Sequence, residues 1–277
     1  MRFVTFEIDG HPHAGVISGD SVIDLTAAGF STLLEFIEHG SLDIARSSDG
    51  ARIHLSRVKL RAPIPQPRKL ICVGLNYLDH AKETGAELPK VPTIFNKFAT
   101  SVIGPGENIV LPKVSNAPDY EAELAFVVGR GGRHIAAENW AGHVFGYTII
   151  NDVSARDYQK ATSQWLMGKT FDTFAPMGPW IVSANEIADP HSLDIQLEIN
   201  GEKLQNSNTR ELIFKIPELI AFLSSVFTLQ PGDIVSTGTP AGVGFTRQPP
   251  RFLRAGEVVT VKIESIGELT NPIVAES

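Results

Sequence analysis

The chain has 277 residues, of which 43% are hydrophobic and 20% charged, and its formal net charge is −7. The ordinary apolar content excludes a disordered or fibrous protein, and the surplus of acid argues against a general nucleic-acid binder, which needs Lys and Arg to neutralise phosphate. The single cysteine, Cys72, cannot form an internal disulfide, so we expect folding in a reducing compartment.

The N-terminal residues predict a small α+β domain over 1–62. The first residues alternate like a strand, unlike a signal peptide, and no apolar run approaches the ~20 residues that cross a bilayer. We therefore expect a cytoplasmic protein without a membrane partner. Three short strands are expected, at Phe3–Ile8, Ala14–Ile17 and Ser21–Leu25. A helix is expected over Thr32–His39 with Ser31 as its cap, and the proline-rich residues 63–68 predict a stiff linker.

Residues 69–277 predict a larger, mainly β domain. Two helices are expected, over Tyr77–Thr84 and Pro217–Phe227. Apolar runs between turn residues predict strands at Leu70–Val73, Leu124–Val128, Phe145–Ile150, Trp180–Val182, Asp194–Ile199, Ile234–Ser236 and Val258–Ile263. Many short strands with few helices favour a rolled or sandwiched sheet over repeated βαβ units. The expected fold class is α+β, mainly β.

An acidic pair precedes one of these strands. Because side chains alternate along a strand, Glu121 and Glu123 share one face and Leu124 lies on the other. This spacing alone favours a solvated strand edge. Asp152, which follows the apolar run Val144–Ile150, favours a functional site instead, because ionised carboxylates rarely follow buried strands without a partner. Three carboxylates without clustered His or Cys suit Mg²⁺ or Mn²⁺.

Five motifs follow one another along residues 66–277. They are Gly74–Glu83, Asp119–Glu123, Asn151–Gln159, Gly168–Asp172 and Thr237–Val243. Together they resemble the fumarylacetoacetate hydrolase family, in particular its acylpyruvase and oxaloacetate decarboxylase members. The resemblance implies a mixed β-sandwich roll with a small N-terminal domain, usually a homodimer, that binds Mg²⁺ or Mn²⁺. It makes Glu121, Glu123 and Asp152 the metal ligands.

The resemblance also implies roles for residues around the metal. His80 and Glu83, spaced i and i+3 on a helix, would form a dyad in which Glu83 orients the imidazole and His80 takes a proton from water. Without the resemblance, a His and a Glu at this spacing are more typical of a solvated helix face. Lys169 is implied as a catalytic residue, although it could also merely balance the carboxylates. The implied substrate contacts are Arg156, Gln159 and Thr239.

The implied activity is metal-dependent hydrolysis of a C–C bond in 2,4-dioxo acids such as acylpyruvates. In this reaction a metal-stabilised pyruvate enolate leaves after attack by the water that His80 activates. Oxaloacetate decarboxylation, isomerisation of a hydroxydienedioate and a metal-binding protein without turnover are the alternatives. Cys72 lies in an apolar run and is expected to pack in the core rather than act as a nucleophile. Residues 85–91 are expected to form a lid hinge.

Overall fold

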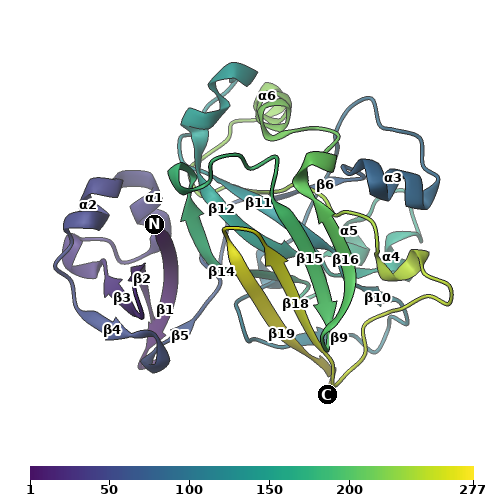
Figure 1. Ribbon diagram of the computed structural model, residues 1–277, viewed down its shortest axis with the longest axis horizontal. Coiled ribbons are helices and arrows are strands. Elements are labelled where there is room, and N and C mark those ends of the chain that lie inside the picture. Colours follow the sequence, from purple (N-terminus) through teal and green to yellow (C-terminus); the bar gives the residue numbers. More distant parts are fainter.

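The computed structural model describes all 277 residues. The chain forms two large packed sheets, a separate two-stranded pair and six α-helices (Figure 1). The strands are β1 (Arg2–Ile8), β2 (His11–Ser18), β3 (Ser21–Asp24), β4 (Arg52–His54), β5 (Lys59–Leu60), β6 (Leu70–Gly74), β7 (Thr93–Asn96), β8 (Val102–Ile103), β9 (Ile109–Leu111), β10 (Pro118–Asp119), β11 (Ala122–Val128), β12 (Val144–Asn151), β13 (Ser154–Ala155), β14 (Ala175–Ser183), β15 (Asp194–Ile199), β16 (Glu202–Asn208), β17 (Ile234–Ser236), β18 (Val258–Ile263) and β19 (Gly267–Ala275). The helices are α1 (Leu33–His39), α2 (Leu42–Ser47), α3 (Leu78–Thr84), α4 (Arg156–Gln159), α5 (Leu166–Lys169) and α6 (Ile216–Val226).

The larger sheet has the strand order β4-β3-β2-β1-β14-β12-β11-β17-β6-β7, with β5 beside β1 and β8 beside β14. The second sheet has the order β16-β15-β18-β19-β9 and packs across β11, β12 and β14, while β10 and β13 form a separate pair. This arrangement confirms the predicted mainly β sandwich. No helix combines the length and the apolar character that crossing a bilayer requires.

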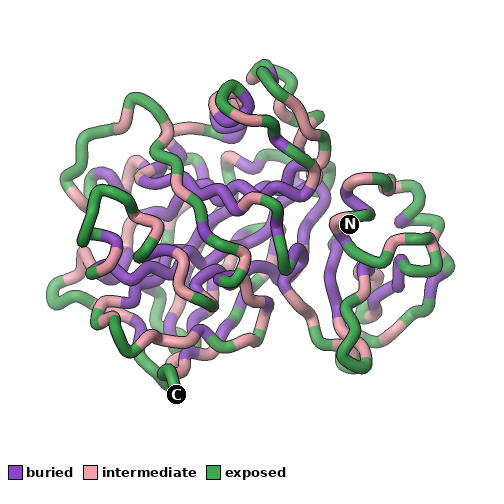
Figure 2. The backbone as a smooth tube through the Cα atoms, turned by 180° about the vertical axis from the view of Figure 1, so that it is seen from behind, coloured by how far each residue is buried: buried purple, intermediate pink, exposed green.

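Strand β11 lies between two hydrophobic cores, which explains why it is buried on both faces. Leu124 and Phe126 point into the core between the two sheets. Ala125 and Val127 point the other way, into a core that also contains Phe3 of the N-terminal lobe. Figure 2 shows the buried backbone concentrated in the middle of the larger lobe. A polar side chain near the end of β11 is therefore enclosed on both sides.

The N-terminal strands form a lobe of their own in Figure 1, yet they share a sheet with the rest of the chain. Strand β1 pairs with β14, with Phe3 opposite Ile181. The proline-rich residues 63–68 are partly buried, and the Thr5 hydroxyl donates to the Pro63 carbonyl at 2.7 Å. The segment is therefore packed against the lobe rather than free. The division into domains at 63–68 stays a prediction.

Most predicted elements are confirmed within one or two residues, and two expectations need correction. Helix α1 is capped by Thr32 rather than Ser31, because the Thr32 hydroxyl accepts from the Glu35 N–H while the Glu35 carboxylate accepts from the Thr32 N–H. The strand expected at Trp180–Val182 is only the end of the longer β14. Its first half was missed because it contains two prolines and Gly178, a composition typical of turns.

Candidate active site

The ends of β11 and β12 bring the three predicted metal ligands together. Glu121 directly precedes β11, and Asp152 directly follows β12. The strands are antiparallel, with Ala122 opposite Asn151, and the Asp152 N–H donates to the Glu121 carbonyl at 2.9 Å. The register of one strand pair thus places the acidic pair beside a carboxylate that is distant in sequence.

The resulting triad is buried, so the solvated-edge alternative is wrong. Glu121 is 5% exposed, Glu123 1% and Asp152 0%, and one oxygen atom of each lies within 4.8 Å of the others. Burial, Asp152 and Glu121 together raise the pKa of Glu123 well above its usual value. A hard divalent cation among the three carboxylates would relieve this repulsion, and the all-oxygen donor set fits such an ion.

Three cationic side chains contact the triad. Lys169 at the end of α5 bridges it, with Nζ 2.6 Å from Glu121 Oε2 and 2.8 Å from Asp152 Oδ2. Arg156 Nη2 lies 2.6 Å from Glu121 Oε1, and Lys97 Nζ lies 2.5 Å from Asp152 Oδ1. Burial alone raises the pKa of Glu121, but Lys169 and Arg156 outweigh it and lower that pKa to about 2. Glu121 is therefore held as a carboxylate.

Sequence reasoning missed several residues that support the triad. Lys97 has a side chain that is 0% exposed, yet it follows the exposed edge strand β7, where nothing in the pattern marks a buried lysine. Glu123 accepts hydrogen bonds from the Ser236 hydroxyl at 2.5 Å and from the Gly238 N–H at 3.0 Å. Ser236 is the last residue of β17, which pairs with β11, and Gly238 lies two residues beyond it, so strand pairing would have been needed to find these donors.

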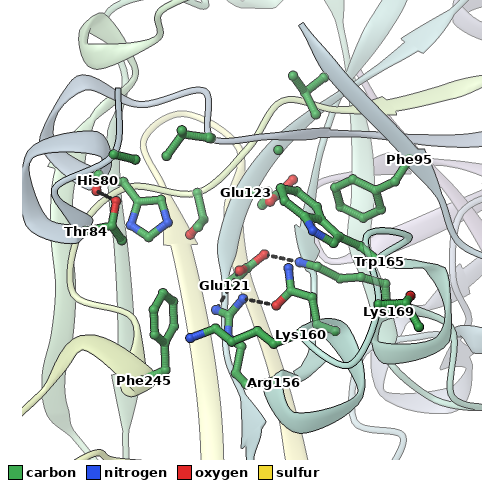
Figure 3. Close-up of a pocket in the computed structure, with 17 residues that line it drawn as sticks. His80, Thr84, Phe95, Glu121, Glu123, Arg156, Lys160, Trp165, Lys169 and Phe245 are labelled. Carbon is green, nitrogen blue, oxygen red and sulfur yellow. Dashed lines mark hydrogen bonds and ion pairs between the residues drawn. The ribbon is translucent and has the colours of Figure 1, made fainter. Parts of the chain in front are cut away.

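A cavity of about 370 Å³ opens onto the triad (Figure 3). Seven of the predicted site residues line it: His80, Glu121, Glu123, Arg156, Gln159, Lys169 and Thr239. The predicted residues Glu83 and Asp152 are not among its lining. Phe95, Trp165 and Phe245 supply aromatic walls, and Figure 3 places His80 beside Phe245, on the side away from Phe95 and Trp165.

His80 and Glu83 form the expected pair on α3. His80 Nδ1 lies 3.2 Å from Glu83 Oε2, and His80 Nε2 has no hydrogen-bond partner within the chain. Glu83 Oε1 also accepts from the Gly242 N–H at 3.0 Å, which ties α3 to the loop that follows Thr239. Burial raises the pKa of Glu83, but the hydrogen bonds from His80 and Gly242 outweigh it and hold that pKa below its usual value. A Glu83 carboxylate accepts a hydrogen bond from the Nδ1–H group of His80, and this tautomer leaves Nε2 unprotonated and free to act as a base.

The predicted substrate contacts are positioned by neighbours. Gln159 Oε1 accepts from Arg156 Nη1 at 2.9 Å, which leaves the Gln159 amide nitrogen free. Thr239 Oγ1 accepts from Gln205 Nε2 at 2.9 Å. Gln205, on β16, also accepts from the Ala122 N–H, and sequence reasoning did not single it out. The structure brings these residues to one cavity, and their contact with substrate stays a prediction.

Cys72 does not have the character of a nucleophile. It is fully buried in β6, and burial together with Asp152 and Glu123 raises the pKa of its thiol well above the usual value. A thiol in such a place stays protonated and packs as a small apolar side chain.

The match to a known family covers most of the chain. Residues 69–274 match the family model described as Fumarylacetoacetate (FAA) hydrolase C-terminal. The chain belongs to this family. It is 46% identical to the mitochondrial oxaloacetate tautomerase fahd2 of Xenopus laevis over 288 residues, which cover 99% of this chain and 90% of the frog protein.

Solved structures of family members resemble the whole chain. Fumarylacetoacetate hydrolase from Exiguobacterium antarcticum has a TM-score of 0.89 and 38% identity, with 100% of both chains covered. Maleylpyruvate hydrolase from Sphingobium sp. SYK-6, solved with manganese (II) ion and pyruvate, has a TM-score of 0.83 and 33% identity, also with 100% of both chains covered. The predicted family and fold are therefore confirmed. The frog relative is named as mitochondrial. The cytoplasmic location expected for the present chain stays a prediction.

Proposed function

We propose that this protein moves a proton between carbon 3 and the carbonyl oxygen of a 2-oxo acid, which interconverts the keto and enol forms, with oxaloacetate as the first substrate to test. The observation that carries the proposal is the His80–Glu83 pair. Its imidazole ring lines the cavity that opens onto the carboxylate triad, and the Nε2 atom of that ring has no hydrogen-bond partner within the chain. The name of the frog relative, an oxaloacetate tautomerase, supports the choice of substrate.

The triad is the proposed binding site for a divalent ion. Glu121, Glu123 and Asp152 would hold Mg²⁺ or Mn²⁺, and the manganese in the maleylpyruvate hydrolase structure supports this choice. When bound, such an ion supplies Lewis-acid polarisation of the substrate carbonyl.

The side chains of this chain then carry the proton. His80 Nε2 takes the proton from carbon 3, and the electron pair of that C–H bond forms the double bond between carbons 2 and 3. The carbonyl oxygen gains the negative charge, which the cationic Lys169 stabilises from the cavity wall. His80 returns the proton to that oxygen. Reactant and product are isomers, so the reaction consumes neither water nor an oxidant.

Hydrolysis of a C–C bond in 2,4-dioxo acids is the second candidate. The same Nε2 would take a proton from water, which would attack the distal carbonyl and release pyruvate as its enol. The maleylpyruvate hydrolase structure with manganese and pyruvate supports this candidate. Both candidates use the same dyad, so the substrate decides between them.

One panel of assays tests both candidates. The purified protein is assayed with Mg²⁺, with Mn²⁺ or with chelator, on enol-oxaloacetate by loss of its ultraviolet absorbance and on acetylpyruvate by pyruvate release in a coupled assay. Release of CO₂ from oxaloacetate is followed in parallel to detect decarboxylation. Metal-dependent loss of enol without CO₂ or pyruvate supports the tautomerase, whereas pyruvate release from acetylpyruvate supports the hydrolase. Absence of turnover under every metal condition would leave a metal-binding protein without enzymatic activity.

We also propose that the protein is a homodimer, as the family resemblance implies. Size-exclusion chromatography with light scattering tests this, and a mass equal to one chain contradicts it.

A further inference from the structure

Lys160 is a cation at the cavity that has no acidic partner. It follows α4, lines the cavity and is exposed. No carboxylate lies within ion-pair distance of its ammonium group. The other lysine of the cavity, Lys169, is by contrast 2% exposed and bound to two carboxylates. Lys160 therefore has hydrogen-bond donors available to a ligand.

An aromatic ring fixes the position of this free ammonium group. Lys160 Nζ lies 4.2 Å from the centroid of the Phe245 ring, and the Arg156 guanidinium carbon lies 4.5 Å from the same centroid. The two cations are four residues apart, and Figure 3 shows the Lys160 side chain reaching toward Phe245 on the side of the cavity where His80 lies. The ring attracts the ammonium group without occupying its N–H donors.

The charges deeper in the site already balance one substrate carboxylate. Four buried carboxylates face three buried cations there: Asp119, Glu121, Glu123 and Asp152 against Lys97, Arg156 and Lys169. Together these groups carry one net negative charge, and a bound divalent ion turns it into one net positive charge. The carboxylate beside the 2-oxo group of the substrate neutralises that positive charge. Glu83 is satisfied by His80 and Gly242 and does not line the cavity. The charge of Lys160 remains without a counterpart.

We propose that Lys160 binds a second carboxylate at the far end of the substrate, so that the protein selects 2-oxo dicarboxylic acids over 2-oxo monocarboxylic acids. This inference rests on the proposed function, because it assumes a 2-oxo acid whose first carboxylate lies at the triad. The second carboxylate would then lie on the side of His80 and Phe245, away from the apolar wall that Phe95 and Trp165 form.

Two acids that differ only in the second carboxylate test the inference. Oxaloacetate carries a carboxylate where 2-oxobutanoate carries a methyl group, and both have protons on carbon 3. Exchange of these protons with D₂O, followed by NMR, gives kcat and KM for both acids in one assay. Lys160→Met is expected to lower the preference for oxaloacetate over 2-oxobutanoate by roughly 10- to 100-fold, mainly through KM, as expected for loss of a charged hydrogen bond. Lys160→Arg is expected to restore most of the preference.

Controls separate this role from a structural one. Lys203→Met removes an exposed lysine that has no ion pair and does not line the cavity, and it should leave the preference unchanged. If Lys160→Met changes the kinetic constants for both acids equally, or changes them for neither acid, the inference is overturned. If the unmodified protein exchanges no proton, the proposed function fails, and calorimetric titration of the metal-loaded protein with both acids then tests Lys160 alone. Equal or undetectable binding of the two acids in that titration also overturns the inference.

Discussion

Replacement of Glu83 by Gln tests the proposed base most directly. The two oxygens of Glu83 have different partners, with Oε1 accepting from the Gly242 N–H at 3.0 Å and Oε2 lying 3.2 Å from His80 Nδ1. Gln has nearly the same shape, but only one of its two polar atoms accepts a hydrogen bond. The substitution therefore changes the donor pattern of the pair while the helix keeps its position.

The expected loss follows from the tautomer of His80. Gly242 offers a fixed N–H donor, so the Gln oxygen stays there and the amide NH₂ faces His80 Nδ1. Nδ1 must then accept, which moves the imidazole proton to Nε2, the atom that has to take the substrate proton. We expect kcat to fall by about 10²- to 10⁴-fold, the usual contribution of a general base. This corresponds to about 3–5 kcal/mol of activation free energy.

Three measurements make this prediction refutable. Steady-state turnover gives kcat, calorimetric titration with Mn²⁺ gives metal affinity, and thermal unfolding gives stability, and only kcat should change for Glu83→Gln. Glu87→Gln is the matched control, because Glu87 is an exposed residue of the following loop that does not line the cavity. If kcat of Glu83→Gln is not reduced, the dyad has no part in the mechanism. If the variant loses affinity for Mn²⁺, its effect arises at the metal site.

Three further substitutions test the metal site and the fold. Glu123→Ala should lose metal affinity and activity together, and calorimetry that finds unchanged affinity contradicts its assignment as a ligand. Gly168→Ala should lower the free energy of unfolding by about 1–3 kcal/mol and also reduce kcat by shifting the adjacent Lys169, because a Cβ there would lie 2.3 Å from the Gln159 backbone nitrogen; an unchanged urea midpoint contradicts this. Burial raises the pKa of Glu107, but the Gly104 N–H and the side chains of Lys59 and Arg61 outweigh it and hold the pKa below its usual value. The stabilisation that Glu107 provides is thus present above its unfolded-state pKa and lost as the pH falls through the lower folded-state pKa. Glu107→Gln should therefore destabilise the protein by up to ~1 kcal/mol at neutral pH and have no effect in acid, and a difference in melting temperature that persists in acid refutes this reasoning.

Much of the candidate site was accessible from the sequence because its residues stand in short motifs. Side-chain alternation placed Glu121 and Glu123 on one face, and the carboxylate of Asp152 after a buried strand was conspicuous. The His80–Glu83 spacing brings both residues to one side of a helix whatever the rest of the fold does. Local geometry placed these residues relative to one another. Their assignment as metal ligands and as a catalytic dyad also needed the resemblance to the family, because the same spacings are typical of solvated surfaces.

The parts that were missed depend on strand pairing across long stretches of chain. Lys97 reaches Asp152 only because β7, β6, β17 and β11 are neighbours in one sheet, and Gln205 reaches Thr239 only because β16 belongs to the covering sheet. The start of β14 was missed for a different reason, since its prolines contradict local strand propensity and only its neighbours hold it extended.

The cations around the triad explain how two of its three buried carboxylates, Glu121 and Asp152, can persist in the folded chain. A buried ionised group costs several kcal/mol unless it is paired. Lys169 and Arg156 pair with Glu121, and Lys169 and Lys97 pair with Asp152. Glu123 contacts no cation and accepts hydrogen bonds only from a hydroxyl and a backbone N–H. A divalent ion therefore gives Glu123 a positive partner that it otherwise lacks, whereas the other two carboxylates already have theirs. The fold does not depend on the ion to neutralise Glu121 and Asp152, so removal of the metal should abolish activity while the chain stays folded.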